Sequence, residues 1–327
     1  MKFIFKKLST SELEKSFNIL QFIESHNGLV FHEPELNRIV SEQFNTKFYY
    51  YTVTLGYDII ALCPIHTMNK GFVKKTETKP LYDIPYGGFV FEEGKVSEKE
   101  LIKYIKPAIS ERIYYFSNPF NYSQIEKTNS YLKKETAIIN LALSEEDIWL
   151  NVINSKRRNM IRKAQKSGIV TQKYSSQESL KLFWPLLENL HKKHWKINLP
   201  IEYYIEIINF FSSKNKAKIL IALKNEKVLS GIILIGNENV MHYWKGASKQ
   251  GVKNEGQGEL LQWEAIKWAK NSGAKYYDLC VVEPERLPHI AKFKMGFSKQ
   301  LVPFIFFQKD HLLFKLLIKC KNCFHKK

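Results

Sequence analysis

The chain has 327 residues, of which 44% are apolar, and its formal net charge is +18. This length allows two domains that each bury a core, and the apolar content excludes a largely disordered protein. Composition and pattern also argue against a membrane span, a signal peptide and a disulfide framework, because apolar runs are short and the four cysteines are scattered. We therefore expect a cytoplasmic globular protein. Its excess of lysine indicates either an anionic partner or a solvated basic surface.

The first half of the chain alternates between helical and β-rich patterns. Helical spacing of apolar residues and runs of β-branched and aromatic residues are the signals used. A capping-box pattern at Ser144–Asp147 marks the start of the next helix, and the domain boundary is placed just before it. This gives an N-terminal domain of residues 1–143. Its predicted elements are a helix at 11–25, strands at 48–55 and 59–65, a helix at 97–109, and strands at 112–116 and 136–143.

The second half repeats the same order of elements without repeating residues. It starts with helices, continues with a meander of strands, and closes with a helix and further strands. We predict a second domain of residues 144–310, followed by a basic amphipathic segment at 311–327. The predicted elements are helices at 145–167 (with a break near Asn154), 177–194 and 199–211, strands at 217–223, 227–235 and 240–245, a helix at 259–271, a strand ending at 278, a short helix near 289–294, and a strand at 302–307.

A glycine-rich loop, Lys253–Gly258, joins the strand at 240–245 to the helix at 259–271. The first amides of a helix lack internal partners and the helix dipole is positive there, so phosphate groups bind at such a position. The alternative is a flexible loop that ends in a glycine cap. If the loop holds a donor phosphate, backbone amides of the preceding strand can bind the acyl carbonyl. The residues expected at this donor site are Tyr243, Trp244, Lys245, Lys253, Gly256 and Gly258.

A basic helix follows residue 154. Arg158, Arg162 and Lys166 recur every four residues, which places them on one face. Guanidinium groups bind phosphate in a bidentate manner, so Arg158 and Arg162 are candidate contacts to a phosphorylated substrate or RNA. A solvated face of an amphipathic helix is the equal alternative.

Asp278, Phe293 and Lys294 are the candidates for the chemical step. A lysine beside a reacting carbonyl can stabilise an oxyanion, and a strand-end aspartate can orient or deprotonate an amine. The alternatives are a turn residue for Asp278 and a surface charge for Lys294.

Two further patterns carry less chemistry. His191 and His194 lie one helical turn apart, but no cysteine or carboxylate completes a metal set, so no metal is predicted. His194 and Trp195 are expected to line a core or a cleft, and Trp195 is a candidate substrate contact. In the segment 311–327, leucines and lysines alternate as in a helix that packs on the second domain or lies on a membrane.

Several short motifs lie in a fixed order along nearly the whole chain. They are Phe31–Pro34, Gly87-Gly88, Trp149 with Lys156–Ala164 and Gly168, Tyr243–Ser248, Trp263–Ala269, Gly273 with Tyr277-Asp278, and Phe293-Lys294 with Gly296-Phe297. In these motifs and in their order the chain resembles the Fem-type proteins. The loop Lys253–Gly258 is also similar to the Arg/Gln-x-x-Gly-x-Gly/Ala signature of the N-acetyltransferase (GNAT) superfamily, with lysine in the first position.

The resemblance implies an α/β (α+β) fold of tandem GNAT-like domains, each a mixed, mainly antiparallel sheet flanked by helices. One branch of the family transfers an amino acid from aminoacyl-tRNA to a peptidoglycan precursor. The other branch contains acyl- or acetyltransferases of cell-envelope, polysaccharide or lipid pathways. In the aminoacyl branch the Phe-Lys pair lies at the reacting centre, and that role transfers to Phe293 and Lys294.

Two departures favour the acyltransferase branch: Leu279-Cys280-Val281 replaces a Gly-Gly pair after the Tyr-Asp strand, and the glycine-rich loop is present. We therefore expect an N-acyltransferase that uses acyl-CoA, such as acetyl-CoA, and an anionic or lipid-linked acceptor. The alternatives are an aminoacyl-tRNA-dependent bridge-forming transferase and a non-catalytic protein that docks on a membrane or nucleic acid. Peripheral contact with the inner face of the membrane would involve 311–327.

Overall fold

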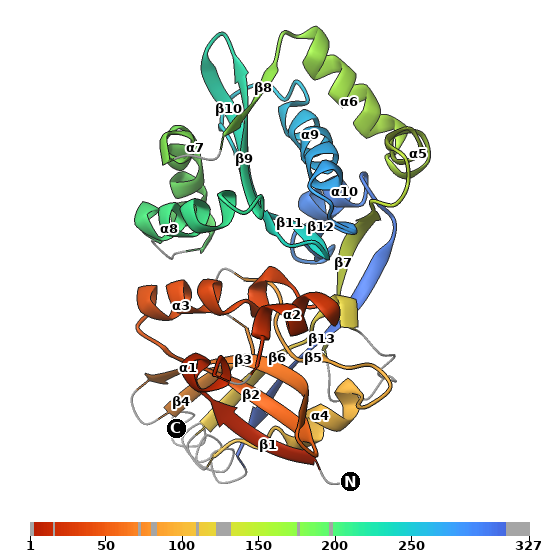
Figure 1. The fold of residues 1–327 in the computed structure, drawn as a ribbon. Coiled ribbons are helices and arrows are strands. Elements are labelled where there is room, and N and C mark those ends of the chain that lie inside the picture. The colour runs from red at the N-terminus through yellow and green to blue at the C-terminus, as the bar shows by residue number, and fades with distance from the viewer. Residues whose placement is uncertain are drawn as a thin grey trace, which may run out of the picture. The chain divides into compact units, whose positions relative to one another are not determined.

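The chain forms two compact units, which we describe separately (Figure 1). Unit 1 consists of Met1–Lys134 and Pro303–Lys327, and unit 2 consists of Glu135–Val302. No helix in the part of the chain that the structure describes has the length and apolar character needed to span a membrane. The computed structural model describes residues 3–15, 17–70, 73–79, 84–108, 111–121, 132–174, 177–195 and 199–311.

Unit 1 contains a mixed sheet in the order β1-β2-β3-β4-β6-β13, and β5 pairs with β3. The neighbours are antiparallel except β4 and β6, which run parallel. β1, β4 and β5 were not expected from the sequence, because they are short or alternate with lysines. The strands are β1 Phe3–Leu8, β2 Lys47–Leu55, β3 Asp58–Lys70, β4 Val73–Glu77, β5 Val90–Phe91, β6 Glu111–Phe116 and β13 Leu301–Asp310.

Short helices accompany this sheet. The helix expected at 11–25 is two helices, because Ser9 caps the first and the side chain of Asn18 caps the second by accepting from Gln21 N. The helices are α1 Thr10–Leu13, α2 Ile19–Ser25, α3 Pro34–Gln43 and α4 Glu98–Tyr104, with single turns η1 Val30–His32 and η2 Pro119–Asn121.

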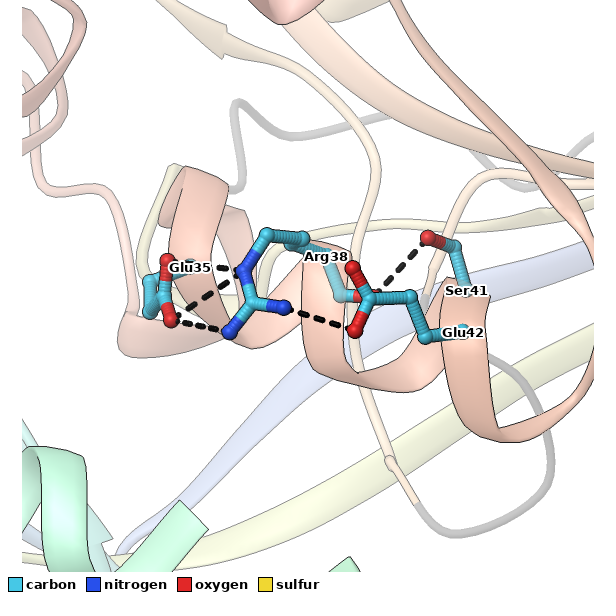
Figure 2. Close-up of polar contacts among 4 residues, drawn as sticks. All are labelled: Glu35, Arg38, Ser41 and Glu42. Atoms are coloured by element: carbon cyan, nitrogen blue, oxygen red, sulfur yellow. Dashed lines mark hydrogen bonds and ion pairs between the residues drawn. The ribbon is translucent and has the colours of Figure 1, made fainter. Parts of the chain in front are cut away.

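The solvent face of α3 carries a local ion-pair series (Figure 2). Arg38 lies between Glu35 and Glu42, with N···O distances of 2.6 and 2.7 Å, and Ser41 donates to the Arg38 carbonyl. Pairs at this spacing on an exposed helix contribute about 0.3–0.5 kcal/mol each. These contacts all lie within α3, so their role is to stabilise the helix.

The two motifs of the first half meet in the interior of unit 1. His32 Nε2 lies 3.0 Å from the Gly87 carbonyl, and the Tyr50 hydroxyl donates to the His32 carbonyl at 2.6 Å. A side chain at position 87 would collide with the Thr78 carbonyl, since a Cβ there would lie 1.8 Å from it. This explains the glycine and gives these motif residues a structural role.

Unit 2 contains a sheet in the order β7-β12-β11-β10-β9-β8, in which only β11 and β12 run parallel. The strands are β7 Leu132–Asn140, β8 Val170–Tyr174, β9 Ala217–Lys224, β10 Lys227–Gly236, β11 Val240–Ser248 and β12 Tyr276–Val282. The helices are α5 Glu145–Asp147, η3 Ile148–Val152, α6 Ser155–Lys166, α7 Gln177–Leu190, η4 His191–Trp195, α8 Ile201–Ser212, α9 Gln257–Asn271 and α10 Pro288–Lys294.

Residues of β11 alternate between the two faces of this sheet. Met241 and Tyr243 pack with α9 in the main apolar core of unit 2. Trp244 lies on the other face, against Tyr204 of α8, with 5.4 Å between the ring centroids. His242 shares that face by strand alternation. α9 therefore covers one side of the site described below, and α7 and α8 pack on the strands from the other side.

The boundaries of the two compact units differ from the boundaries of the two domains expected from the sequence, 1–143 and 144–310. β7 pairs with β12, with Asp278 opposite Ile138, so residues 135–143 join unit 2. β13 pairs with β6, with Phe306 opposite Phe116, so the end of the described chain joins unit 1. The capping pattern at 144 marks a helix start correctly, but it does not show which strands pair. Of the segment 311–327, only residue 311 is described.

Candidate active site

β11 and β12 separate in the middle of the unit 2 sheet. Their described parallel ladder has three pairs and ends at His242 opposite Asp278, although β11 continues to Ser248 and β12 to Val282. The pairing of β11 with β10 also shifts by one residue at Trp244, which is a bulge. Strand separation beside a bulge turns main-chain groups away from regular pairing, so this position suits recognition of a carbonyl group.

A buried polar group lies at the point of separation. His242 Nδ1 is 2.7 Å from Asp278 Oδ2, and both side chains are fully buried. The other carboxylate oxygen, Oδ1, accepts hydrogen bonds from the Thr136 hydroxyl and, at 2.8 Å, from Cys280 N–H. Burial pushes the pKa of Asp278 up, but the hydrogen bonds from His242, Thr136 and Cys280 outweigh it and lower the pKa below its usual value. Asp278 is therefore held as a carboxylate.

Lys294 of α10 lies near this group. Its Nζ donates to the Val281 carbonyl at 2.8 Å, and 9% of the residue is exposed. Burial lowers the pKa of Lys294, against the opposing effects of Cys280, Asp278 and Glu283. Two of the predicted residues, Asp278 and Lys294, are thus brought to one region.

Cys280 adopts a left-handed backbone conformation, with φ of 61°, and its thiol is buried. Burial is the main reason that its pKa is raised well above the usual value, and the charges of Lys294 and Lys245 only partly oppose this. The thiol is therefore protonated at neutral pH. His242, Asp278 and Cys280 offer possible metal-ligand atoms within 4.8 Å of one another. The hydrogen bonds already made by Asp278 and the two nearby lysine charges favour a protonic site over a cation site.

The predicted carbonyl-binding residues sit at the bulge. Burial raises the pKa of Tyr243 to about 12, and its ring covers Gly246, where a Cβ would lie 2.0 Å from the tyrosine hydroxyl. Lys245 is buried, and its Nζ lies 5.4 Å from the centroid of the Trp244 ring. The bulge is thus held by close packing on both faces.

The ring of Phe293 lies near the start of α9. A Cβ on Gly258 would be 3.9 Å from its ring, and the guanidinium carbon of Arg157 lies 4.8 Å from the ring centroid. Arg157 also pairs with Glu259 at 2.6 Å. Phe293 therefore takes part in joining α10 to α6 and α9.

The glycine-rich loop is partly closed by its own side chains. Gly256 N–H donates to Asn254 Oδ1 and Glu255 N–H donates to Gln257 Oε1, each at 2.9 Å. Gly256, with φ of 93°, is the cap of α9, and a Cβ there would lie 2.1 Å from the Met160 carbonyl. Position 256 therefore needs a glycine for the close packing of this loop on α6. Lys253 is exposed.

The basic residues of α6 make contacts within unit 2. Arg158 Nη1 donates to the carbonyls of Trp149, Leu150 and Ile153, which caps the preceding π-helical turn η3. The Arg162 guanidinium lies 5.3 Å from the Trp149 ring centroid. These contacts indicate structural roles, and substrate binding by Arg158 and Arg162 stays a prediction.

The second histidine region is described only in part. His191 is buried and stacks on Tyr204, with 6.0 Å between ring centroids. The side chains of His194 and Trp195 fall outside the described residues. Substrate contact by Trp195 therefore stays a prediction.

His242 was not predicted from the sequence. Its side chain meets Asp278 across strands, 36 residues apart in the chain, so no local motif marks it. The available signal was the strand–helix–strand order from β11 to β12, which predicts parallel neighbours whose facing residues can be compared.

Residues 154–287 match a family model described as an acetyltransferase (GNAT) domain. This region is similar to GNAT domains. It contains the strand separation, the loop and the His242–Asp278 pair. No curated protein sequence matches the chain.

Solved structures are similar over almost the whole chain. A crystal structure of FemX has a TM-score of 0.68 at 14% identity and covers 96% of this chain and 99% of its own. The C-terminal domain of a putative lysylphosphatidylglycerol synthetase from Agrobacterium fabrum has a TM-score of 0.53 at 11% identity, covering 92% and 96%. A tandem GNAT protein from the clavulanic acid biosynthesis pathway has a TM-score of 0.52 at 9% identity, covering 94% and 98%. At these identities the similarity shows the fold, and it confirms the expected tandem GNAT-like architecture.

Proposed function

We propose that the protein is an N-acyltransferase that moves an acyl group from a thioester to an amine. The observation that carries this proposal is the separation of β11 from β12 after His242 and Asp278, inside the GNAT domain. In this proposal the acyl carbonyl lies at the bulge, where main-chain amides near Tyr243–Lys245 bind its oxygen. Hydrogen-bond donors aimed at a developing oxyanion usually contribute more to the rate of acyl transfer than any other single effect.

Three side chains are proposed to serve the chemical step. Lys294 supplies positive charge near the oxyanion, supported by its burial and its fixed Nζ. Asp278 orients the amine side of the site, supported by its ionised state. Phe293 positions α10 on the start of α9. Acyl-CoA would supply the thioester, with its phosphates at Lys253, Gly256 and Gly258.

The acceptor is proposed to be an anionic or lipid-linked precursor of the cell envelope, including peptidoglycan, used at the inner face of the membrane. The fold similarity to FemX and to a protein named for a lysyl-lipid product supports this class. The formal charge of +18 also favours an anionic acceptor.

Calorimetry with acetyl-CoA tests the donor. Gly258→Glu is a better test than a substitution of Gly256, because a Cβ at 258 meets only the Phe293 ring at 3.9 Å. The variant should therefore keep the fold and place a negative charge in the proposed phosphate site. The wild-type chain should bind saturably and the variant more weakly. Asn271→Glu, at the other end of α9, is the charge control. Lack of binding to acyl-CoA of any chain length would rule out the thioester donor.

A second candidate function is aminoacyl transfer from aminoacyl-tRNA. The main-chain amides of Glu255 and Gly256 favour this donor over acyl-CoA. They already donate hydrogen bonds to side chains of the same loop, whereas a CoA phosphate would need them as its own donors. Binding of charged tRNA should then weaken steeply between about 50 and 200 mM salt. Filter binding that shows no affinity, or affinity independent of salt, would reject this donor.

A further inference from the structure

The pair His242–Asp278 has the geometry of a proton acceptor and the carboxylate that orients it. With Nδ1 donating to Asp278 Oδ2 at 2.7 Å, the neutral ring carries its basic lone pair on Nε2. The pair is the last one of the β11–β12 ladder. The imidazole is therefore fixed at the place where the proposed acyl group and amine would meet.

We propose that His242 takes the proton of the attacking amine, and that Asp278 is its positioning residue. This inference rests on the proposed N-acyl transfer and assigns the base in it. A base whose other nitrogen is held by a third group is the arrangement that activates nucleophiles in many unrelated sites.

Atoms and charges balance in this step. The amine nitrogen forms a bond to the carbonyl carbon of the thioester, and one of its protons passes to His242 Nε2, directly or through one water. The carbon–sulfur bond then breaks as the tetrahedral species collapses to the amide. The imidazolium returns its proton to the leaving thiolate, which departs as a thiol. Donor and acceptor are the only reactants.

Asp278 is suited to orient the base and unsuited to be the base. Its Oδ1 already accepts from the Thr136 hydroxyl and from Cys280 N–H, and its Oδ2 accepts from His242. A carboxylate with three donors stays ionised and stabilises an imidazolium beside it. Thr136, from β7, is therefore part of the positioning set.

The neighbouring charged and titratable groups bear on how this pair responds to pH. On the same two strands these are Tyr243, Lys245, Asp278 and Cys280, and α10 contributes Lys294. The ammonium groups of the two lysines and the carboxylate of Asp278 have opposite electrostatic effects on this site. The pH profile of the reaction reports the balance.

The decisive variant is His242→Asn. The asparagine amide can replace Nδ1–H as a donor to Asp278, so the buried carboxylate keeps its partner while the base is lost. With an acyl-CoA and an amine acceptor, we expect kcat to fall about 100- to 10,000-fold with little change in donor binding, and the low-pH limb of the profile to disappear. His66→Asn is the matched control, since His66 is a buried histidine in unit 1 bonded to Asn37 and Thr46. An unchanged kcat in His242→Asn would overturn the proposal.

A second measurement decides the proposal even if no acyl transfer is found. Nitrogen NMR of histidine-labelled wild-type protein, with the His242 signals assigned by their loss in His242→Asn, reads the tautomer. We expect a proton on Nδ1 and a lone pair on Nε2 at pH 8, with the Nδ1 proton signal shifted in Asp278→Asn. A proton on Nε2 with the lone pair on Nδ1, or a ring doubly protonated from pH 6 to 9, would overturn it. Failure of donor binding alone would instead overturn the proposed function.

Discussion

At the scale of single residues, the environment of Glu98 changes the acidity of its carboxyl group strongly. It lies fully buried on α4 in unit 1, where the Tyr115 hydroxyl donates to its Oε1. Burial raises the pKa of Glu98 to about 8, and the Tyr115 hydrogen bond only partly opposes this. Its carboxyl is therefore protonated when the protein is folded at neutral pH and ionised when the chain is unfolded.

This difference predicts how stability depends on pH. The folded state binds the proton more tightly, so the contribution of Glu98 is complete below its unfolded pKa of about 4.5 and is lost as pH rises toward 8. The slope contributed by this group approaches about 1.4 kcal/mol per pH unit in that window. Glu98→Gln keeps an acceptor for Tyr115 and should flatten the slope, making the variant more stable than wild type at pH 8.

Urea unfolding at pH 5, 6.5 and 8 measures this effect. Glu93→Gln, an exposed residue before the same helix, is the control and should follow the wild-type curve. Parallel curves for Glu98→Gln and wild type would show that Glu98 is ionised in the folded protein.

Residue-scale prediction from the sequence depended on whether a residue lies in a local motif. Asp278 lies at the end of the strand expected from the sequence, and Lys294 follows Phe293 in a short helix. The structure brings both residues to one region, and their roles in a reaction stay predictions. The partner of His242 lies on another strand, and the backbone carbonyls that Arg158 bonds could not be predicted from its spacing along the helix. Local pattern shows the type of a side chain and its spacing, whereas its partner depends on tertiary packing.

At the scale of elements, one ion pair joins three helices around the candidate site. Arg157 of α6 pairs with Glu259 of α9 at 2.6 Å and donates to the Lys292 carbonyl of α10 at 3.1 Å. The two side chains are 11% and 4% exposed. Gly296 leaves the space that Arg157 needs, because a Cβ there would lie 2.6 Å from Nε.

Arg157→Met should therefore be strongly destabilising. It leaves the Glu259 carboxylate buried without its partner, which costs about 3–5 kcal/mol. Adding Glu259→Gln removes the buried charge and should restore part of the loss, whereas Arg162→Met, on the exposed side of the same helix, should change stability little. Chemical denaturation of wild type, Arg157→Met, Glu259→Gln and the double variant gives the coupling energy between the two side chains, and Arg162→Met is measured beside them as the control. Equal stability of the single and double variants would mean that Glu259 finds another partner.

Elements with a strong period were predicted well. α9 begins two residues before the expected helix and ends at the same residue, and β9 and β10 match their expected runs to within one residue. β8 was missed, because a polar strand at the edge of a sheet has no apolar pattern. The separation of β11 from β12 could not be predicted from the sequence either, because it depends on the pairing register between the two strands.

At the scale of the whole molecule, the sequence predicted two domains but not where the chain passes between them. A break at 143/144 leaves β7 outside the second domain, although β7 pairs with β12 and supplies Thr136 to Asp278. Likewise, β13 pairs with β6, and Arg112 of β6 bonds Asp310 at 2.8 Å. Strand order in a sheet is set by contacts distant in sequence, so local composition does not reveal it.

This arrangement predicts which fragments fold. A fragment of residues 132–302 keeps every strand of the unit 2 sheet and should give a cooperative thermal transition. A fragment of residues 144–310 lacks β7, so the edge of β12 loses its partner and the buried Asp278 loses the hydroxyl of Thr136. Removal of that strand also takes Ile139, which is 1% exposed in the intact chain, out of the apolar core of unit 2. We expect this fragment to aggregate or to melt without a transition. Circular dichroism and light scattering of the two fragments make the comparison, and cooperative unfolding of both would mean that unit 2 folds without β7.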